Sequence, residues 1–198
     1  MQIDDTQYKS IIKFIDENFH QYYTMYDFSK YSLDDYIEYQ YNFSSLAPKN
    51  TSIEEALKWK WGHAGKNNFP QSHKDIIKEV ETNWKYFALQ SFLVPKDTFD
   101  YWQNIFNGRK AYITTVYITH LVHNTEIPII DQHNYRAMNH LIKIFVNGDY
   151  QFKKSPSNWN DLIQFTNFIN YISKSMNIDK EKLDKFLMMY GKSIKKSI

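Results

Sequence analysis

Apolar side chains recur at helical spacing along most of the chain. Between residues 72 and 92 they lie three, four and seven positions apart, which is the spacing of one face of an α-helix. These residues are Ile76, Ile77, Val80, Trp84, Phe87 and Ala88. The aromatic N-terminal segments 11–23 and 36–43 are also interpreted as helices, and no segment gives a convincing strand pattern. The pattern therefore predicts an all-α fold.

The segment 109–124 is the one most easily mistaken for a strand. It contains several β-branched residues, which lower helix propensity. Its apolar positions nevertheless fit one face of a helix, and they are Ile113, Val116, Tyr117, His120 and Leu121. We therefore predict a helix here, with these residues on a single face.

Residues typical of helix termini separate the predicted helices. The predicted starts are the capping box from Thr51 to Glu54, Pro95, Asp131, Pro156 with Asn158, and Asp179. The predicted ends are Gly62, Asn107 with Gly108, Gly148 and Gly191. Because no repeat or low-complexity linker interrupts the 198 residues, we expect a single compact helical unit over residues 1–198, built as one domain or as two closely packed lobes.

The composition excludes several kinds of chemistry. The chain has no cysteine, which excludes disulfides, thiolate nucleophiles, cysteine-bound zinc and iron–sulfur clusters. It has neither a signal peptide nor an apolar run of about 20 residues, so we expect a cytoplasmic protein without a membrane partner. The net charge of +2 does not by itself indicate a polyanion as partner. The 16 Tyr, 14 Phe and 5 Trp are expected mainly to fill a core, and such rings also provide stacking faces for bases.

The segment 126–138 (EIPIIDQHNYRAM) carries the most suggestive chemistry. An apolar run leads directly to the carboxylate of Asp131, which stands at the predicted start of a helix. A helix N-terminus favours an ionised carboxylate and directs free backbone N–H groups towards phosphates. A short predicted helix, a break at residues 107–108 and a new helix that starts at residue 109 precede this segment.

Two short elements and one arginine can be interpreted together, namely Gly-Arg-Lys at residues 108–110, Pro-Ile-Ile-Asp at residues 128–131, and Arg136. In this combination the chain resembles, over about residues 96–146, the helix-hairpin-helix DNA glycosylase superfamily, which includes endonuclease III-like, adenine-specific and 8-oxoguanine-specific enzymes. The Pro-Ile-Ile-Asp element looks most like the adenine-specific branch. The hairpin departs from the family's Pro-Gly-apolar-Gly core, because Phe-Asn-Gly at residues 106–108 lacks one glycine.

The resemblance implies an all-α, two-lobed protein with a helix-hairpin-helix-like element that cleaves the N-glycosidic bond of a base flipped out of double-stranded DNA. It implies that Asp131 stabilises the positive charge at C1′ of the sugar, and that either Lys110, through a Schiff base, or water is the nucleophile. No cofactor and no metal are expected. The candidate DNA-binding residues are Asn107, Gly108, Arg109 and Arg136. The candidate base-pocket residues are Trp59, Trp61, His133 and Tyr135.

Two other function classes stay open at this point. Asp131 can be a helix N-cap and nothing more, in which case the chain is a non-catalytic DNA-binding or interaction protein. Alternatively, His120 and His123 share a predicted helix, and His133, His140 and Asp131 are near in sequence. Histidines and a carboxylate of this kind can hold the metal ion of a hydrolase.

The base that would be excised is not specified by the sequence. Damaged purines, deaminated or oxidised pyrimidines, and modified bases of invading phage DNA are all compatible with it, which leaves DNA repair and antiviral defence as alternatives. Trp59 and Trp61 lie two positions apart and so point in different directions on a helix, which leaves one of them for a ligand and one for the core. The oligomeric state is not specified either.

Overall fold

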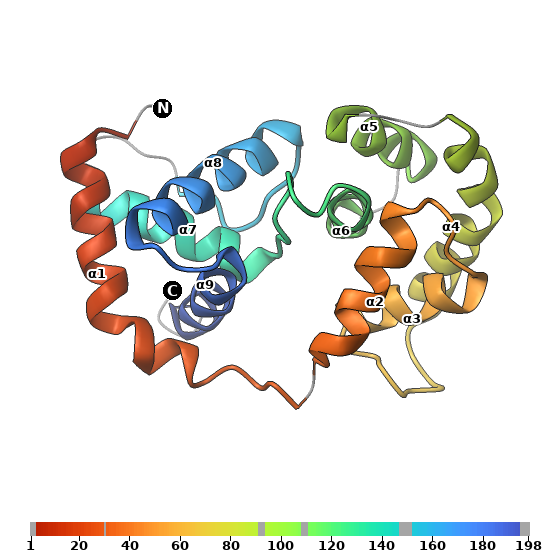
Figure 1. Cartoon of the computed structure of the whole chain (residues 1–198), viewed down its shortest axis with the longest axis horizontal. Coiled ribbons are helices and arrows are strands. Elements are labelled where there is room, and N and C mark those ends of the chain that lie inside the picture. The colour runs from red at the N-terminus through yellow and green to blue at the C-terminus, as the bar shows by residue number, and fades with distance from the viewer. Residues whose placement is uncertain (1–2, 30, 91–93, 108–110, 147–151, 195–198) are drawn as a thin grey trace. The chain divides into compact units, whose positions relative to one another are not determined.

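The computed structural model describes residues 3–29, 31–90, 94–107, 111–146 and 152–194, and these segments form nine α-helices and no strand (Figure 1). The helices are α1 (Asp5–Tyr23), α2 (Leu33–Ser44), α3 (Asn50–Lys60), α4 (Gln71–Gln90), α5 (Pro95–Ile105), α6 (Tyr112–Val122), α7 (Gln132–Phe145), α8 (Trp159–Met176) and α9 (Lys180–Ile194). The predicted all-α fold is confirmed, including the aromatic N-terminal segments and the β-branched segment. Within the described segments, no helix has both the length and the apolar character needed to cross a membrane.

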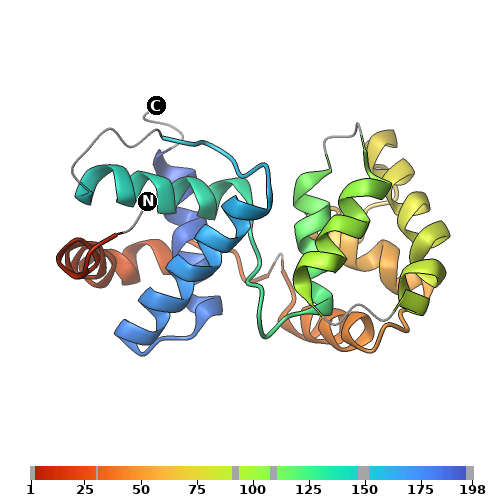
Figure 2. The same cartoon turned by 90° about the horizontal axis from the view of Figure 1, so that it is seen from above.

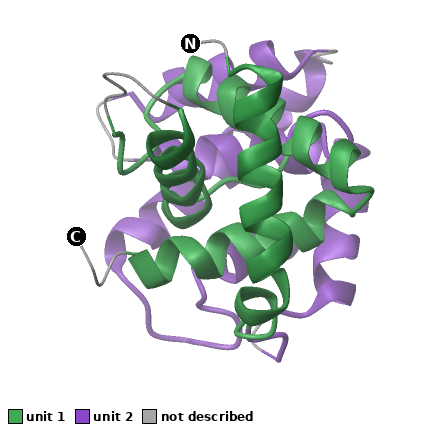
Figure 3. Cartoon of the chain, turned by 90° about the vertical axis from the view of Figure 1, so that its left-hand side faces the viewer, with its two compact units in different colours: residues 1–26, 128–198 green, residues 27–127 purple. Residues whose placement is uncertain are grey.

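The chain divides into two compact units (Figure 3). Unit 1 contains residues 1–26 and 128–198, which include α1, α7, α8 and α9, so both ends of the chain belong to it. Unit 2 is the continuous segment 27–127, which includes α2 to α6. Asp131 is therefore in unit 1, whereas the predicted hairpin falls in the residue range of unit 2. The single compact helical unit over residues 1–198 stays a prediction.

Unit 1 is built on two helices that pack along each other, α7 and α9 (Figures 1 and 2). Helices α1 and α8 pack against the same pair. The fully buried apolar side chains of this core include Ile11, Ile15, Leu141, Ile142, Leu162, Phe165, Leu183, Phe186 and Leu187. Because burial of apolar surface is the dominant stabilising term in folding, this core stabilises α7, which begins directly after Asp131.

Helix α9 continues past Gly191 to Ile194, so the predicted helix end at Gly191 is wrong. Gly191 is buried where α9 meets the first turn of α7. A Cβ atom added to Gly191 would lie only 1.9 Å from the carbonyl oxygen of His133. Glycine is therefore required here for the close approach of two backbones, and not for a turn.

In unit 2, α6 is buried on nearly all sides, between α5 and α2 (Figures 1 and 2). All residues from 114 to 121 are buried, so the other faces of this helix are covered as well as the predicted one. Two threonines of this helix satisfy their hydroxyl groups locally: Thr119 donates to the carbonyl oxygen of Thr115 at 2.9 Å, and Thr115 donates to that of Ala111 at 3.2 Å. Because these side chains need no partner outside the helix, they can be buried at little cost.

Several predicted helix termini are confirmed. The confirmed starts are Pro95 for α5, Asp131 for α7, Asn158 for α8 and Asp179, which immediately precedes α9. Gly62 ends α3 in a left-handed conformation with φ of +69°. The next N–H group, from His63, reaches back to the carbonyl oxygen of Lys58 at 2.7 Å, as in a Schellman motif.

The predicted capping box from Thr51 to Glu54 is wrong. Helix α3 begins two residues earlier than this box implies, and Lys49 stands at the N-cap position without a capping side-chain bond. The N–H group of Ile53 donates to the carbonyl oxygen of Lys49 at 3.1 Å, so the first turn already includes Thr51. This start buries the whole side chain of Ile53, and that burial outweighs the local capping preference.

Candidate functional site

Asp131 caps the N-terminus of α7. Its Oδ1 atom accepts hydrogen bonds from the backbone N–H groups of His133, at 2.6 Å, and Asn134, at 3.0 Å. Its own N–H group donates to the side-chain oxygen of Asn134 at 2.8 Å, which completes a capping box. Among the described residues, its Oδ2 atom has no hydrogen-bond partner, and the residue is only half-buried. The carboxylate is thus held in one orientation through one of its two oxygens.

Asn134 holds this turn in place, although the sequence did not single it out. Its side-chain Nδ2 group donates to Oδ1 of Asp184 in α9 at 2.5 Å and to the carbonyl oxygen of Ile129 at 3.3 Å. The residue is 1% exposed. One buried amide therefore ties together the apolar run, the capping carboxylate and α9. The only local signal is its spacing, because an amide at the third helical position after an Asp cap can form a capping box.

Arg136 lies between α7 and α9 and is 7% exposed. Its Nη1 group donates to the carbonyl oxygen of Gly191 and to Nδ1 of His133, both at 3.2 Å. These contacts give Arg136 a packing role and leave little of its guanidinium accessible to a phosphate, so its DNA contact stays a prediction that the burial does not favour. His133 is half-buried, and its place in a base pocket also stays a prediction.

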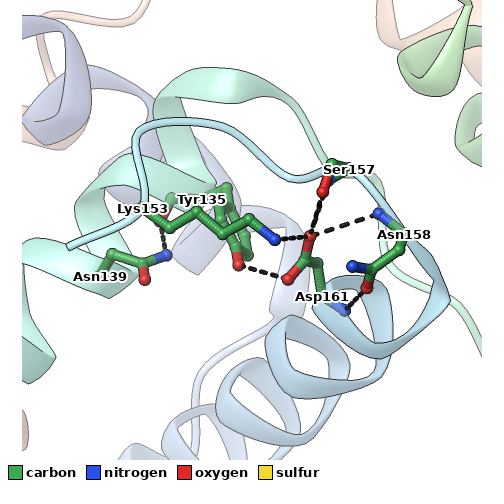
Figure 4. A network of polar contacts seen from close by, with 6 residues as sticks. All are labelled: Tyr135, Asn139, Lys153, Ser157, Asn158 and Asp161. Atoms are coloured by element: carbon green, nitrogen blue, oxygen red, sulfur yellow. Dashed lines mark hydrogen bonds and ion pairs between the residues drawn. The ribbon is translucent and has the colours of Figure 1, made fainter. Parts of the chain in front are cut away.

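Tyr135 belongs to a buried polar network around Asp161 (Figure 4). Its hydroxyl donates to Oδ1 of Asp161 at 3.0 Å. The Oδ2 atom of Asp161 accepts from the ammonium group of Lys153, from the N–H of Ser157 at 2.7 Å and from the N–H of Asn158 at 3.3 Å. Tyr135 itself is 1% exposed, which leaves no open ring face on which a base could stack.

The same network controls the charge of Asp161. Burial alone raises the pKa of this carboxyl, but the hydrogen bonds from Lys153, Ser157 and Tyr135 outweigh burial and lower the pKa below its ordinary value of 3.8. Asp161 is therefore ionised at neutral pH. It stabilises the folded state above about pH 4, and this stabilisation is lost as the pH falls through the lowered pKa. The network anchors the segment before α8 and is structural.

The two tryptophans of the base-pocket prediction point in different directions, as expected. Trp59 is in the core of unit 2 with 8% exposure, and its ring stacks on Tyr36 at a centroid distance of 5.2 Å. Trp61 follows the last residue of α3, is half-buried and lines a pocket. Trp61 is therefore the better base-pocket candidate, and Trp59 is a core residue.

The pocket beside Trp61 has a volume of about 740 Å³. The described residues that line it all belong to unit 2, and they are Trp61, Ser72, His73, Asp75, Ile76, Ile113 and Thr114. They come from the end of α3 and from the N-terminal turns of α4 and α6. The indole of Trp61 stacks on the imidazole of His73 at a centroid distance of 4.1 Å. The pocket thus has one aromatic wall, two apolar side chains and several polar groups.

The histidines that were weighed as metal ligands have other partners. Nε2 of His123 forms a hydrogen bond with the hydroxyl of Thr98 at 2.9 Å, and Nδ1 of His140 forms one with the hydroxyl of Tyr190 at 2.7 Å. His120 and His123 belong to unit 2, whereas His140 belongs to unit 1. Within the part of the chain that the structure describes, no three His, Asp or Glu side chains gather to hold a metal ion.

His120 is buried, and both of its ring nitrogens are occupied. Nδ1 contacts the carbonyl oxygen of Ile127 at 2.5 Å, and Nε2 contacts the hydroxyl of Tyr36. A carbonyl oxygen only accepts, so Nδ1 carries the proton and donates, and Nε2 accepts from Tyr36. Burial is the main cause that lowers the pKa of His120, to about 4 from 6.5. His120 is therefore a neutral core residue that links α6 to α2 and to the end of unit 2.

We expect acid to destabilise the protein through His120. Between pH 4 and 6.5, His120 is protonated in the unfolded chain and neutral in the folded protein. The free energy of unfolding therefore rises with pH in this window. From pH 7 to pH 5 the loss at this site should be about 2 kcal/mol. Urea unfolding at the two pH values measures it. His120→Gln can still donate and accept but does not titrate, so an equally steep pH dependence in this variant would contradict the assignment.

The predicted phosphate-binding turn is described only in part. Asn107 is exposed directly after α5, where its side chain can reach a ligand. Gly108, Arg109 and Lys110 lie outside the described residues, as does Gly148, the predicted end of the helix that Asp131 starts. The DNA contacts of Asn107, Gly108 and Arg109 and the nucleophilic role of Lys110 therefore stay predictions.

Comparisons with known proteins add no relative to this picture. No model of a protein family matches the sequence, and neither a curated protein nor a solved structure matches it.

Proposed function

We propose that the protein is a DNA glycosylase of the helix-hairpin-helix type, which cleaves the N-glycosidic bond of a damaged or modified base flipped out of double-stranded DNA. The observation that supports the proposal is the carboxylate of Asp131, of which one oxygen caps α7 and the other has no hydrogen-bond partner among the described residues. The resemblance at residues 108–110 and 128–131 supports the same function.

The chemistry requires a fixed negative charge. As the base leaves, positive charge builds up at C1′ of the sugar, as in the oxocarbenium-like transition state of glycoside hydrolysis. A preorganised anion beside C1′ stabilises this charge, most strongly where water is excluded. The capping bonds and the buried amide of Asn134 keep the carboxylate of Asp131 from rotating. Asp131 would also activate the nucleophile.

The proposal is tested by incubating the protein with duplexes that each contain one damaged purine or one deaminated or oxidised pyrimidine, and with modified phage DNA. Abasic sites are then measured with and without EDTA. We expect base release from at least one substrate and no effect of EDTA. Cleavage that EDTA abolishes would indicate a metal-dependent hydrolase instead. The substrate that reacts also distinguishes DNA repair from defence against phage.

A non-catalytic helical DNA-binding protein is the second candidate. The capping bonds of Asp131 favour it, because N-capping is the usual role of an Asp at a helix start. In that case the same panel would give DNA binding without any abasic sites. Base release therefore separates the two candidates directly.

Lys110 is expected to form a Schiff base with C1′ of the sugar. Borohydride reduces such an imine to a stable amine, so wild-type protein should be trapped on substrate DNA as a covalent adduct, and Lys110→Ala should not be. The adduct is measured by its retarded migration in a denaturing gel. If wild type releases the base without an adduct, water is the nucleophile and the lysine assignment is wrong.

A further inference from the structure

The chain from the end of α3 to the start of α4 combines aromatic rings with positive charge. Residues 58–78 contain five lysines and one carboxylate, which is a net charge of +4 in a chain whose total is +2. The ammonium groups of Lys58 and Lys74 both lie over the ring of Phe69, at 5.2 and 5.4 Å from its centroid. Lys58 also pairs with Glu54 at 3.4 Å. Lys74 stands between His73 and Asp75, which both line the pocket beside Trp61, so its charge favours an anionic ligand there.

The wall of this pocket is a fixed stacking surface. His73 stacks on Trp61, and Nδ1 of His73 is in turn hydrogen-bonded to Nε2 of His63 at 3.1 Å. Burial and the neighbouring His63 lower the pKa of His73, which favours its neutral form at pH 7. Ile76 and Ile113 add apolar surface. A planar aromatic ligand should bind most favourably to this surface, because stacking on the Trp61 indole requires a flat ring.

The polar side of the pocket selects among planar rings. Asp75 is an exposed lining residue, and its Oδ1 atom accepts from the side chain of Gln71 at 2.9 Å. An ionised carboxylate accepts hydrogen bonds and donates none. It therefore favours a ring edge that presents N–H donors and disfavours one lined with carbonyl oxygens. Guanine presents two adjacent donors, on N1 and the exocyclic amine, whereas the single N–H of thymine lies between two carbonyl groups.

We propose that the pocket beside Trp61 binds a nucleobase with an amino edge, guanine best, with the base stacked on Trp61, its N–H donors on Asp75 and its phosphate attracted by Lys74. This site is in unit 2 and does not involve Asp131. That the base belongs to DNA rests on the function proposed above, whereas its binding in the pocket does not.

Deoxyguanosine and thymidine monophosphates test the site, because they share sugar, phosphate and charge and differ only in the base. Each is titrated into ¹⁵N-labelled full-length protein, and the shift of the Trp61 indole N–H signal is followed by NMR. We expect deoxyguanosine monophosphate to bind about tenfold more tightly than thymidine monophosphate. Trp61→Ala should weaken its binding about tenfold or more, as judged from the other shifted signals, and Trp61→Phe should weaken it less.

Two further variants distinguish specific recognition of the base from non-specific binding. Asp75→Asn should bind the two nucleotides with affinities within about threefold of each other, because an amide can also donate to carbonyl oxygens. Tyr86→Ala removes an exposed aromatic ring outside the pocket, 62% exposed, and should leave both affinities unchanged. Equal binding of the nucleotides by wild type, or undiminished binding by Trp61→Ala, would overturn the proposal. Neither result bears on base release, so this site and the proposed glycosylase can fail separately.

Discussion

Asp131→Asn is expected to bind its substrate DNA about as tightly as wild type and to release the base about 1,000-fold more slowly. The substitution replaces the negative charge at Oδ2 with a neutral amide and so removes the stabilisation of positive charge at C1′. Removing one preorganised electrostatic group from an active site typically costs about 100- to 1,000-fold in rate, and here the group also activates the nucleophile. Single-turnover base release measures the rate, and fluorescence anisotropy of labelled DNA measures the binding.

This substitution separates charge from folding, because Asn caps a helix about as well as Asp. Its amide oxygen can accept the same two N–H bonds that Oδ1 of Asp131 accepts. The matched control is Asp4→Asn, the same exchange at the capping box of α1 in the same unit, which should change neither base release nor stability by a measurable amount. If Asp131→Asn releases the base as fast as wild type, Asp131 is only a helix N-cap and the catalytic assignment is wrong.

The helices could be predicted from the sequence because their signals are local. Apolar periodicity and capping residues act within one or two turns, and they located α4, α5, α7 and α8 closely. The prediction for α6 was incomplete for a physical reason. The predicted face did not include Thr115 and Thr119, which bond to carbonyl groups of their own helix and are buried. Hydroxyl groups that are satisfied locally make a sequence pattern underestimate burial.

The candidate site could be predicted only where it is local. Asp131 could be predicted because the capping residue directly follows the apolar run 127–130 in the sequence. The residues that stabilise its turn belong to α9, far along the chain. Asn134 bonds to Asp184, and Arg136 bonds to Gly191, so the partners are 50 and 55 positions apart. The spacing of apolar residues in the sequence does not indicate contacts between residues so far apart. The same limit explains why Arg136 was interpreted as a phosphate ligand and not as part of the α7–α9 interface.

Gly191→Ala is expected to destabilise the protein by about 3 kcal/mol or more, which lowers Tm by roughly 6–12 °C for a chain of this size. In an exposed helix this substitution would stabilise by about 1 kcal/mol, because alanine is the better helix former. Here the added Cβ would lie 1.9 Å from the carbonyl oxygen and 2.6 Å from the carbonyl carbon of His133. Both are backbone atoms and cannot rotate away, so α9 and α7 must separate. Thermal unfolding followed by circular dichroism measures the change.

Separation of α9 from α7 should also displace the first turn of α7, because His133 supplies one of the two N–H groups that bind Oδ1 of Asp131. We therefore expect the folded fraction of Gly191→Ala to release the base more slowly than wild type at a temperature where both are folded. Gly65→Ala is the matched control: Gly65 has φ of +70° and no atom within 4 Å of an added Cβ, so only backbone strain of about 1–2 kcal/mol is expected, with normal base release. A Gly191→Ala variant that unfolds within about 2 °C of wild type would show that the two helices can yield, and the firm support inferred for Asp131 would be lost.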